Sequence, residues 1–136
     1  MKHEQFIDTS GFYAILAKHD SKHTKARTIL QDAAKKRSTF VTTDYVIDET
    51  ATLLHAKGLS HILPDLFDIV FESHACIIEW MDQDRFRKTR TFFLKHRDHS
   101  WSFTDCFSFL VMKELRITEV VSKDKHFKEA GFTSVL

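Results

Sequence analysis

Short apolar runs alternate in this chain with longer stretches whose apolar residues recur at helical spacing. The short runs predict β-strands at residues 5–8, 39–42, 75–80, 119–122 and 133–136. The longer stretches predict helices at residues 11–19, 21–37, 44–57, 61–72, 82–96 and 103–115. Strands separated by helices form βαβ units, which build parallel sheets with helices on both faces. The predicted fold class is therefore α/β, with three layers (α/β/α) around a central parallel sheet of four or five strands.

The composition favours one globular domain over residues 1–136. Apolar residues make up 43% of the chain and charged residues 29%, which excludes a disordered, collagen-like or coiled-coil chain. With 3 glycines and 1 proline there is little material for the tight hairpins of a small β-barrel. The proline, Pro64, is compatible with its predicted helix only in the first turn.

Charge and cysteine content indicate in which cellular compartment the protein is expected and how it could bind nucleic acid. The chain has 20 Lys and Arg against 19 Asp and Glu, so any nucleic-acid binding must come from a local patch. The two cysteines, Cys76 and Cys106, do not make a disulfide framework or a zinc knuckle, which is typical of a reducing compartment. We find no apolar stretch long enough for a signal peptide or a membrane span. We therefore expect a cytoplasmic protein with no membrane partner.

Acidic residues occupy positions where an α/β sheet holds its ligands, at the carboxyl ends of the strands. Asp8 follows the first predicted strand and Asp124 follows a later one. Glu49 and Asp105 lie early in predicted helices, so all four are expected to converge on one edge of the sheet. A local role stays open for three of them, since Asp8 and Asp124 are placed to cap helices and Asp105 completes a capping box with Ser102.

Glu49 is preferred as a site residue over its neighbour Asp48 on helical spacing. Residues three and four apart share a helix face. Asp48 shares its face with Asp44 and His55, which predicts a solvated polar stripe. Glu49 shares its face with apolar residues such as Leu53, so we expect it to face the core. A carboxylate on such a face must be paired, protonated or bound to a cation.

Four carboxylates drawn together repel one another unless a cation offsets their charge. The spacing of the sequence supplies no obvious lysine for this purpose. Hard oxygen ligands suit Mg²⁺ or Mn²⁺, which retain several waters and contact substrate phosphates. Metal-assisted hydrolysis of a phosphodiester is the chemistry that such a cluster supports.

Four segments carry these acidic residues in characteristic surroundings: FIDTSGFYAIL (6–16), TDYVIDETATLL (43–54), SFTDCFSF (102–109) and VVSKDKHF (120–127). In this order they resemble the four motifs of PIN domains, and the third is the most specific. The matches span almost the whole chain. The resemblance implies a Rossmann-like α/β/α fold and an Mg²⁺- or Mn²⁺-dependent nuclease acting mainly on RNA.

By motif match, the resemblance implies that the catalytic and metal-binding residues are Asp8, Glu49, Asp105 and Asp124. Ser10 and Thr104 match polar positions that support such a site. Short stand-alone PIN proteins are most often VapC-type toxins, which implies an antitoxin partner and a homodimer.

A basic patch over residues 85–97, interleaved with phenylalanines, offers a candidate surface for the RNA backbone. The candidate RNA-binding residues in it are Arg85, Arg87, Lys88 and Arg90. The alternative is an ordinary solvated helix face. For His126, near Asp124, a surface role is favoured over contact with a substrate phosphate. Cys106 is expected to be a small core residue.

Other functions compete with this interpretation. A two-component receiver domain requires paired acids after the first strand, and a haloacid-dehalogenase-type phosphatase requires Asp-x-Asp. Here Asp8 is followed by Thr9 and Ser10, which disfavours both. Two alternatives stay open: a PIN-like RNA- or protein-binding module with an idle site, and a solitary RNA-processing nuclease.

Overall fold

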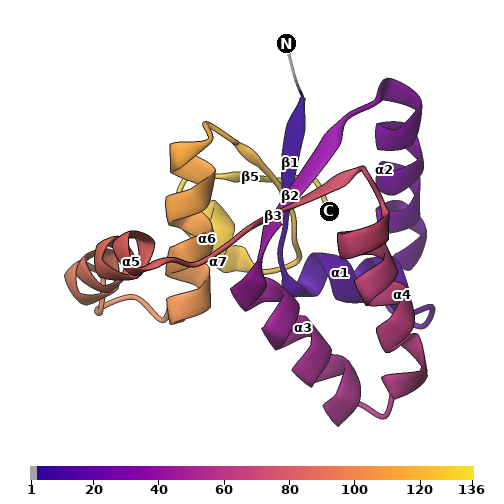
Figure 1. Cartoon of the computed structure of the whole chain (residues 1–136), viewed down its shortest axis with the longest axis horizontal. Coiled ribbons are helices and arrows are strands. Elements are labelled where there is room, and N and C mark those ends of the chain that lie inside the picture. The colour runs from indigo at the N-terminus through magenta and orange to yellow at the C-terminus, as the bar shows by residue number, and fades with distance from the viewer. Residues whose placement is uncertain (1–2) are drawn as a thin grey trace.

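All five strands pair in one parallel sheet in the computed structural model, which describes residues 3–136. The sheet order is β3-β2-β1-β4-β5, with β1 at its centre (Figure 1). The predicted parallel α/β sheet is confirmed, with bounds close to those expected. The strands are β1 (Glu4–Ile7), β2 (Thr39–Thr43), β3 (Cys76–Glu79), β4 (Glu119–Val121) and β5 (Thr133–Ser134).

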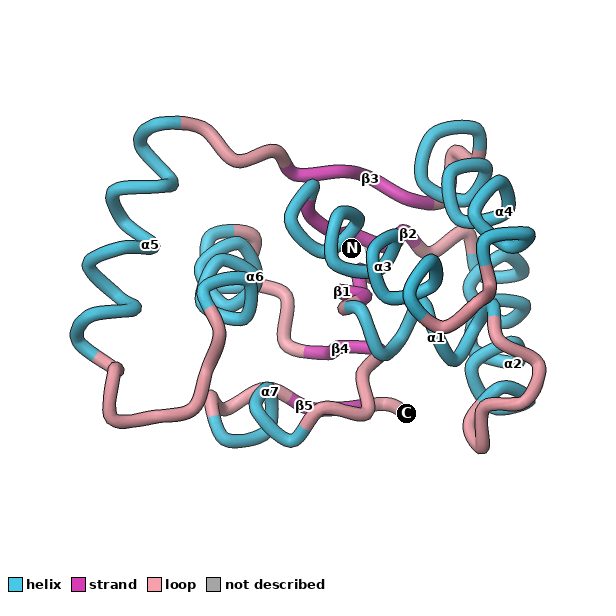
Figure 2. The backbone as a smooth tube through the Cα atoms, turned by 90° about the horizontal axis from the view of Figure 1, so that it is seen from below, coloured by secondary structure: helices cyan, strands magenta, loops and turns pink. Residues whose placement is uncertain are grey.

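Helices cover both faces of the sheet and make the predicted three layers (Figure 2). On one side lie α1, α2 and α4; on the other lie α6 and, outside it, α5. Helix α3 extends from the carboxyl end of β2. The bounds are α1 (Thr9–Leu16), α2 (His23–Lys36), α3 (Asp44–Ala56), α4 (Leu63–Phe67), α5 (Gln83–Lys95), α6 (Phe103–Glu114) and α7 (Lys125–Glu129). Within residues 3–136, none of the helices has the length and apolar character needed to cross a bilayer.

Phenylalanines fill the core between the sheet and α6. Phe6 of β1 is fully buried, as are Phe107 and Phe109 of α6. The ring of Phe109 contacts that of Phe127 edge to face, with the ring centroids 5.0 Å apart, and it meets Trp101 at 5.2 Å. Aromatic pairs of this geometry stabilise a core beyond the area that they bury. The core therefore fixes α6, which carries Asp105, against α7, whose N-cap is Asp124.

One predicted helix is present but changes helix type along its length. Where one α-helix was expected over residues 61–72, the chain passes without a break from a 3-10 turn (Ser60–Ile62) through the helix α4 to a π-helical turn (Asp68–Glu72). Pro64 has no backbone N–H to bond to the preceding turn, so the α-helical ladder begins anew at Leu63. Pro64 lies in the first turn of α4, the position expected for it.

The chain order creates a crevice at the centre of the sheet. From β1 the chain moves outward through β2 and β3, and then it returns to the other side of β1 for β4 and β5. Strands β1 and β4 are neighbours, and the connections that follow them therefore leave in opposite directions. In open α/β sheets ligands bind at such a switch point, beyond the carboxyl ends of the strands.

Gly11 lets helix α1 approach the end of β4 at this switch point. A Cβ atom at Gly11 would lie far inside van der Waals contact with the backbone carbonyl oxygen of Val121. The nearby Asp8 backbone N–H donates to the same oxygen over 3.5 Å. Because the obstructing atom belongs to the backbone, it cannot move aside by changing rotamer.

We predict that Gly11→Ala lowers the free energy of unfolding by about 3 kcal/mol or more, since overpacking against backbone forces α1 away from β4. The measurement is urea denaturation followed by circular dichroism. Gly58→Ala is the control, because φ at Gly58 is +74° but no other atom lies within 4 Å of the place that its new methyl group would take. It should cost only about 1 kcal/mol. Equal losses for the two variants would contradict this account.

Candidate active site

A cavity of about 240 Å³ opens at the carboxyl edge of the sheet. Its walls come from α1, α3, α6 and the loop after β4, which are far apart in the sequence. The structure brings all six site residues singled out from the sequence to this one place. They are Asp8, Ser10, Glu49, Thr104, Asp105 and Asp124.

Asp8 is the most buried of the four carboxylates, with 6% of its surface exposed. It follows β1 and caps α1, since its Oδ1 accepts a hydrogen bond from the Gly11 backbone N–H at 2.8 Å. The Ser10 hydroxyl also donates to Oδ1, at 2.9 Å, and the Ser122 hydroxyl donates to Oδ2, at 2.7 Å. Burial raises the pKa of Asp8 to about 7, and these hydrogen bonds oppose the rise by favouring the charged form.

Two serine hydroxyls tie the loop after β4 to the start of α1. Ser122 Oγ donates to Asp8 and accepts from the backbone N–H of Asp124 at 2.9 Å. Ser10 Oγ accepts from the backbone N–H of Lys123 at 2.8 Å. Thr104, the other predicted polar residue, lines the cavity from the first turn of α6. The serines therefore hold Asp8 and Asp124 in a fixed relation.

Glu49 lines the cavity but is exposed, so the expectation that it faces the core is wrong. Val46 and Leu53 line the cavity with it, which means that the predicted shared face exists but opens into the cavity. The buried side of α3 is turned further round the helix, toward Ile47 and Thr50. The Thr9 hydroxyl donates to Glu49 Oε1 at 2.6 Å and orients it.

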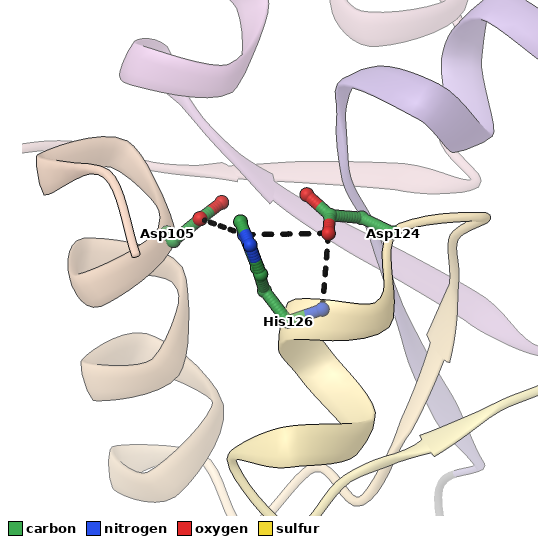
Figure 3. Close-up of side chains that lie close together, drawn as sticks. All are labelled: Asp105, Asp124 and His126. Carbon is green, nitrogen blue, oxygen red and sulfur yellow. Dashed lines mark hydrogen bonds and ion pairs between the residues drawn. The ribbon is translucent and has the colours of Figure 1, made fainter. Parts of the chain in front are cut away.

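His126 lies between the carboxylates of Asp105 and Asp124 (Figure 3). Its Nδ1 is 2.8 Å from Asp105 Oδ2 and 3.3 Å from Asp124 Oδ1, while Nε2 is 3.3 Å from Ser100 Oγ. The three side chains present ligand atoms that all lie within 4.8 Å of one another. The expected surface role for His126 is wrong, because its side chain is only 18% exposed.

Three of the four acidic residues cap helices, and all three also line the cavity. Asp8 caps α1 and Asp124 caps α7, where it accepts the backbone N–H of His126 at 3.0 Å. Asp105 completes the capping box of α6, since it accepts the backbone N–H of Ser102 at 3.1 Å. A cap uses one or two lone pairs of a carboxylate and leaves the others for a ligand.

The cavity concentrates negative charge that the protein does not neutralise with lysine or arginine. Among residues 3–136, neither residue type forms an ion pair with Asp8, Glu49, Asp105 or Asp124. Lys123 reaches the cavity, but its Nζ contacts Asp20 at 2.7 Å. Oxygen donors converging without a protein cation fit Mg²⁺ or Mn²⁺, which prefer carboxylates and water.

The predicted basic patch on α5 is only partly available to a ligand. The side chain of Arg85 is 16% exposed and donates to Glu79 at 2.8 Å and to Glu114 at 3.0 Å. Lys88 pairs with Asp84 one helical turn away. Arg85 thus fastens α5 to the end of β3 and to α6, while Arg87 and Arg90 are exposed.

Sequence reasoning missed three side chains at this site: Thr9, Ser122 and His126. The local signal for the first two was available, because each is a small hydroxyl residue at a strand end within two positions of a predicted acid. For His126 the sequence offers only its distance from Asp124. Its contact with Asp105 depends on how α7 packs against α6. Cys106, in contrast, is buried as expected, and burial raises the pKa of its thiol to about 11.

Comparison with known proteins assigns this arrangement to a family. The family model described as "PIN domain" matches residues 6–133. The chain belongs to the PIN domain family. Two curated proteins with this likeness are both named 23S rRNA-specific endonuclease VapC20, from the CDC 1551 / Oshkosh and H37Rv strains of Mycobacterium tuberculosis. Each is 28% identical over 130 residues, which covers 96% of this chain and 96% of the relative.

A solved structure also resembles this PIN domain. The crystal structure of Mycobacterium tuberculosis VapC20, described as a Sarcin-Ricin loop cleaving toxin, superposes with a TM-score of 0.83 at 26% sequence identity. The match covers 94% of this chain and 95% of the VapC20 chain. The whole sheet and its covering helices thus share one architecture with a solved PIN toxin.

We predict that Asp8 makes the metal-free PIN domain less stable as pH rises. The folded pKa of about 7 lies above the unfolded value near 3.8, so the folded state keeps a proton that the unfolded chain releases. The free energy of unfolding should fall by about 2 kcal/mol from pH 5 to pH 8, relative to Asp8→Asn. Urea denaturation of both proteins in chelator measures this difference. Parallel pH profiles for the two proteins would contradict the raised pKa.

Proposed function

We propose that this chain is a metal-dependent endoribonuclease, the toxin of a VapBC-type toxin–antitoxin pair. The observation that carries the proposal is the single cavity where four carboxylates meet with no lysine or arginine paired to them among residues 3–136. The PIN fold and the likeness to VapC20, which is named a 23S rRNA-specific endonuclease, support RNA as the substrate. The intact acidic set favours an active enzyme over an idle binding module.

The proposed cofactor is Mg²⁺ or Mn²⁺, held by Asp8, Glu49, Asp105 and Asp124. When bound, such an ion activates water for attack on a phosphodiester and offsets the charge that develops on the phosphate. Asp8 offers an ionised carboxylate only when it loses its proton, which a nearby cation promotes. The Ser10 and Ser122 hydroxyls orient this carboxylate by donating to its two oxygens.

His126 positions the other half of the site. With Nδ1 protonated, it donates toward Asp105 and Asp124 and holds the two carboxylates apart at a defined distance. Ser100 Oγ contacts the opposite ring nitrogen and limits rotation of the imidazole. This pairing keeps the carboxylates oriented before any ligand arrives, which lowers the cost of organising the site.

Partners and location follow as parts of the same proposal. A ribonuclease toxin requires a partner that restrains it, so we propose an antitoxin, with the enzyme acting as a single-domain homodimer in the cytoplasm. Apolar surface suitable for a protein partner is present, because Phe71 and Trp80 are each 55% exposed.

We predict that the purified protein cuts cellular RNA with Mg²⁺ or Mn²⁺ and is inactive in chelator. Asp8→Asn and Asp105→Asn should each lower the cleavage rate at least about 100-fold, since losing a ligand costs more than losing its supporting partner. Gel analysis of total RNA measures cleavage, and sequencing of new 5′ ends locates it. If the protein binds metal and RNA but leaves the RNA equally intact in every sample, the result would favour the binding module instead.

Glu49 and Asp48 provide a matched test on one helix. Both are exposed acids on α3, but only Glu49 lines the cavity. Glu49→Gln should lower the cleavage rate at least about tenfold, whereas Asp48→Asn should leave it within about twofold of the parent. Initial rates at saturating Mg²⁺ measure both. Equal effects of the two substitutions would remove Glu49 from the proposed site.

A further inference from the structure

A second hollow, of about 410 Å³, adjoins the acidic cavity and shares Lys123 and Asp124 with it. It runs between the start of α2, the helix α7 and the end of the chain after β5. We call it the lysine groove. It is lined by Lys22, Ser122, Lys123, Asp124, Lys125, Lys128, Ser134 and Leu136.

The lysine groove has the opposite charge to the cavity beside it. Four lysines line it against one aspartate side chain. Lys22, Lys125 and Lys128 are exposed, and in the part of the chain that the structure describes none of the three forms an ion pair. On α5, by comparison, Arg85 and Lys88 are both paired with acids. Free positive charge is therefore available in the groove, directly next to the carboxylates.

We propose that the lysine groove binds backbone phosphates of the RNA strand on one side of the bond that is cut, an inference that rests on the proposed nuclease function. Lysine ammonium groups bind phosphates as point charges and release the counterions around them. Such contacts set the position of a strand without reading its bases. A strand in the groove passes over Lys123 and brings its next phosphate to Asp124.

The position of the groove favours RNA over an acidic peptide. The groove continues into a cavity that carries four carboxylates, which repel the side chains of an acidic segment extending from it. A nucleic-acid strand has a reason to continue there, because a divalent cation held by the carboxylates would attract its phosphate. Lys123 bridges the two regions: its backbone N–H donates to Ser10 and its Nζ pairs with Asp20.

The test measures RNA binding without cleavage, in an Asp105→Asn background with Mg²⁺ present. The probe is a fluorescent single-stranded oligouridylate, and its affinity is measured by anisotropy from about 50 to 200 mM salt. Lys125→Gln combined with Lys128→Gln should weaken binding about tenfold or more at low salt. It should also reduce the steepness of log K against log salt by about 1.4, since each single-strand phosphate contact contributes about 0.7.

Lys35→Gln combined with Lys36→Gln is the matched control. It removes the same charge from exposed lysines at the far end of α2, where the helix C-terminus favours cations. This pair should leave the salt dependence unchanged. Repeating the series in an Asp8→Asn background excludes an effect of the Asp105 capping box, and thermal melts verify folding of each variant.

Unchanged affinity and slope in the Lys125/Lys128 variant would overturn the proposal while leaving the nuclease function intact. A loss of RNA affinity seen only when Arg87→Gln is combined with Arg90→Gln would assign the RNA-binding surface to α5 instead. Intact RNA binding with weakened binding of polyglutamate would assign the groove to an acidic segment. Failure of the parent protein to bind RNA at all would instead overturn the proposed function.

Discussion

The contact between the start of α1 and the end of β4 is the constraint on which the site depends. Asp8 caps α1 and accepts a hydrogen bond from the Ser122 hydroxyl, so one buried carboxylate joins the start of α1 to the end of β4. Gly11 makes the approach possible by presenting no side chain to the Val121 carbonyl. If α1 moved away, Ser10 would lose the hydrogen bond from the Lys123 backbone N–H, and the loop leading to Asp124 would be free to shift.

The sequence predicted the fold well because the strongest signals are local. Buried strands of a parallel sheet read as short apolar runs, and the helices between them show their period clearly. Convergence of Asp8, Glu49, Asp105 and Asp124 followed from strand ends and helix starts, which topology alone brings together. The segment from Ser60 to Glu72 shows the limit of this approach, since periodicity predicts a helix there but not its changes of helix type.

Charge partners escaped prediction because they depend on side chains meeting across elements. Arg85 belongs to a basic run in sequence, yet Glu79 of β3 and Glu114 of α6 neutralise it. His126 meets Asp105 only through the packing of α7 against α6. The prediction from helical spacing was also wrong about what Glu49 faces. Spacing shows which residues share a side of α3, but it does not show whether protein or solvent lies opposite that side.

The pairing of β1 with β4 sets a limit on when the enzyme can exist during its own synthesis. Asp8 and Ser122 are separated by 114 positions, and the carboxylate of Asp124 comes later still. Until a ribosome has produced the second of these segments, β1 can pair only with β2, and Asp8 lacks the hydrogen bond from Ser122. The acidic cavity is therefore incomplete in a growing chain until translation has passed Asp124.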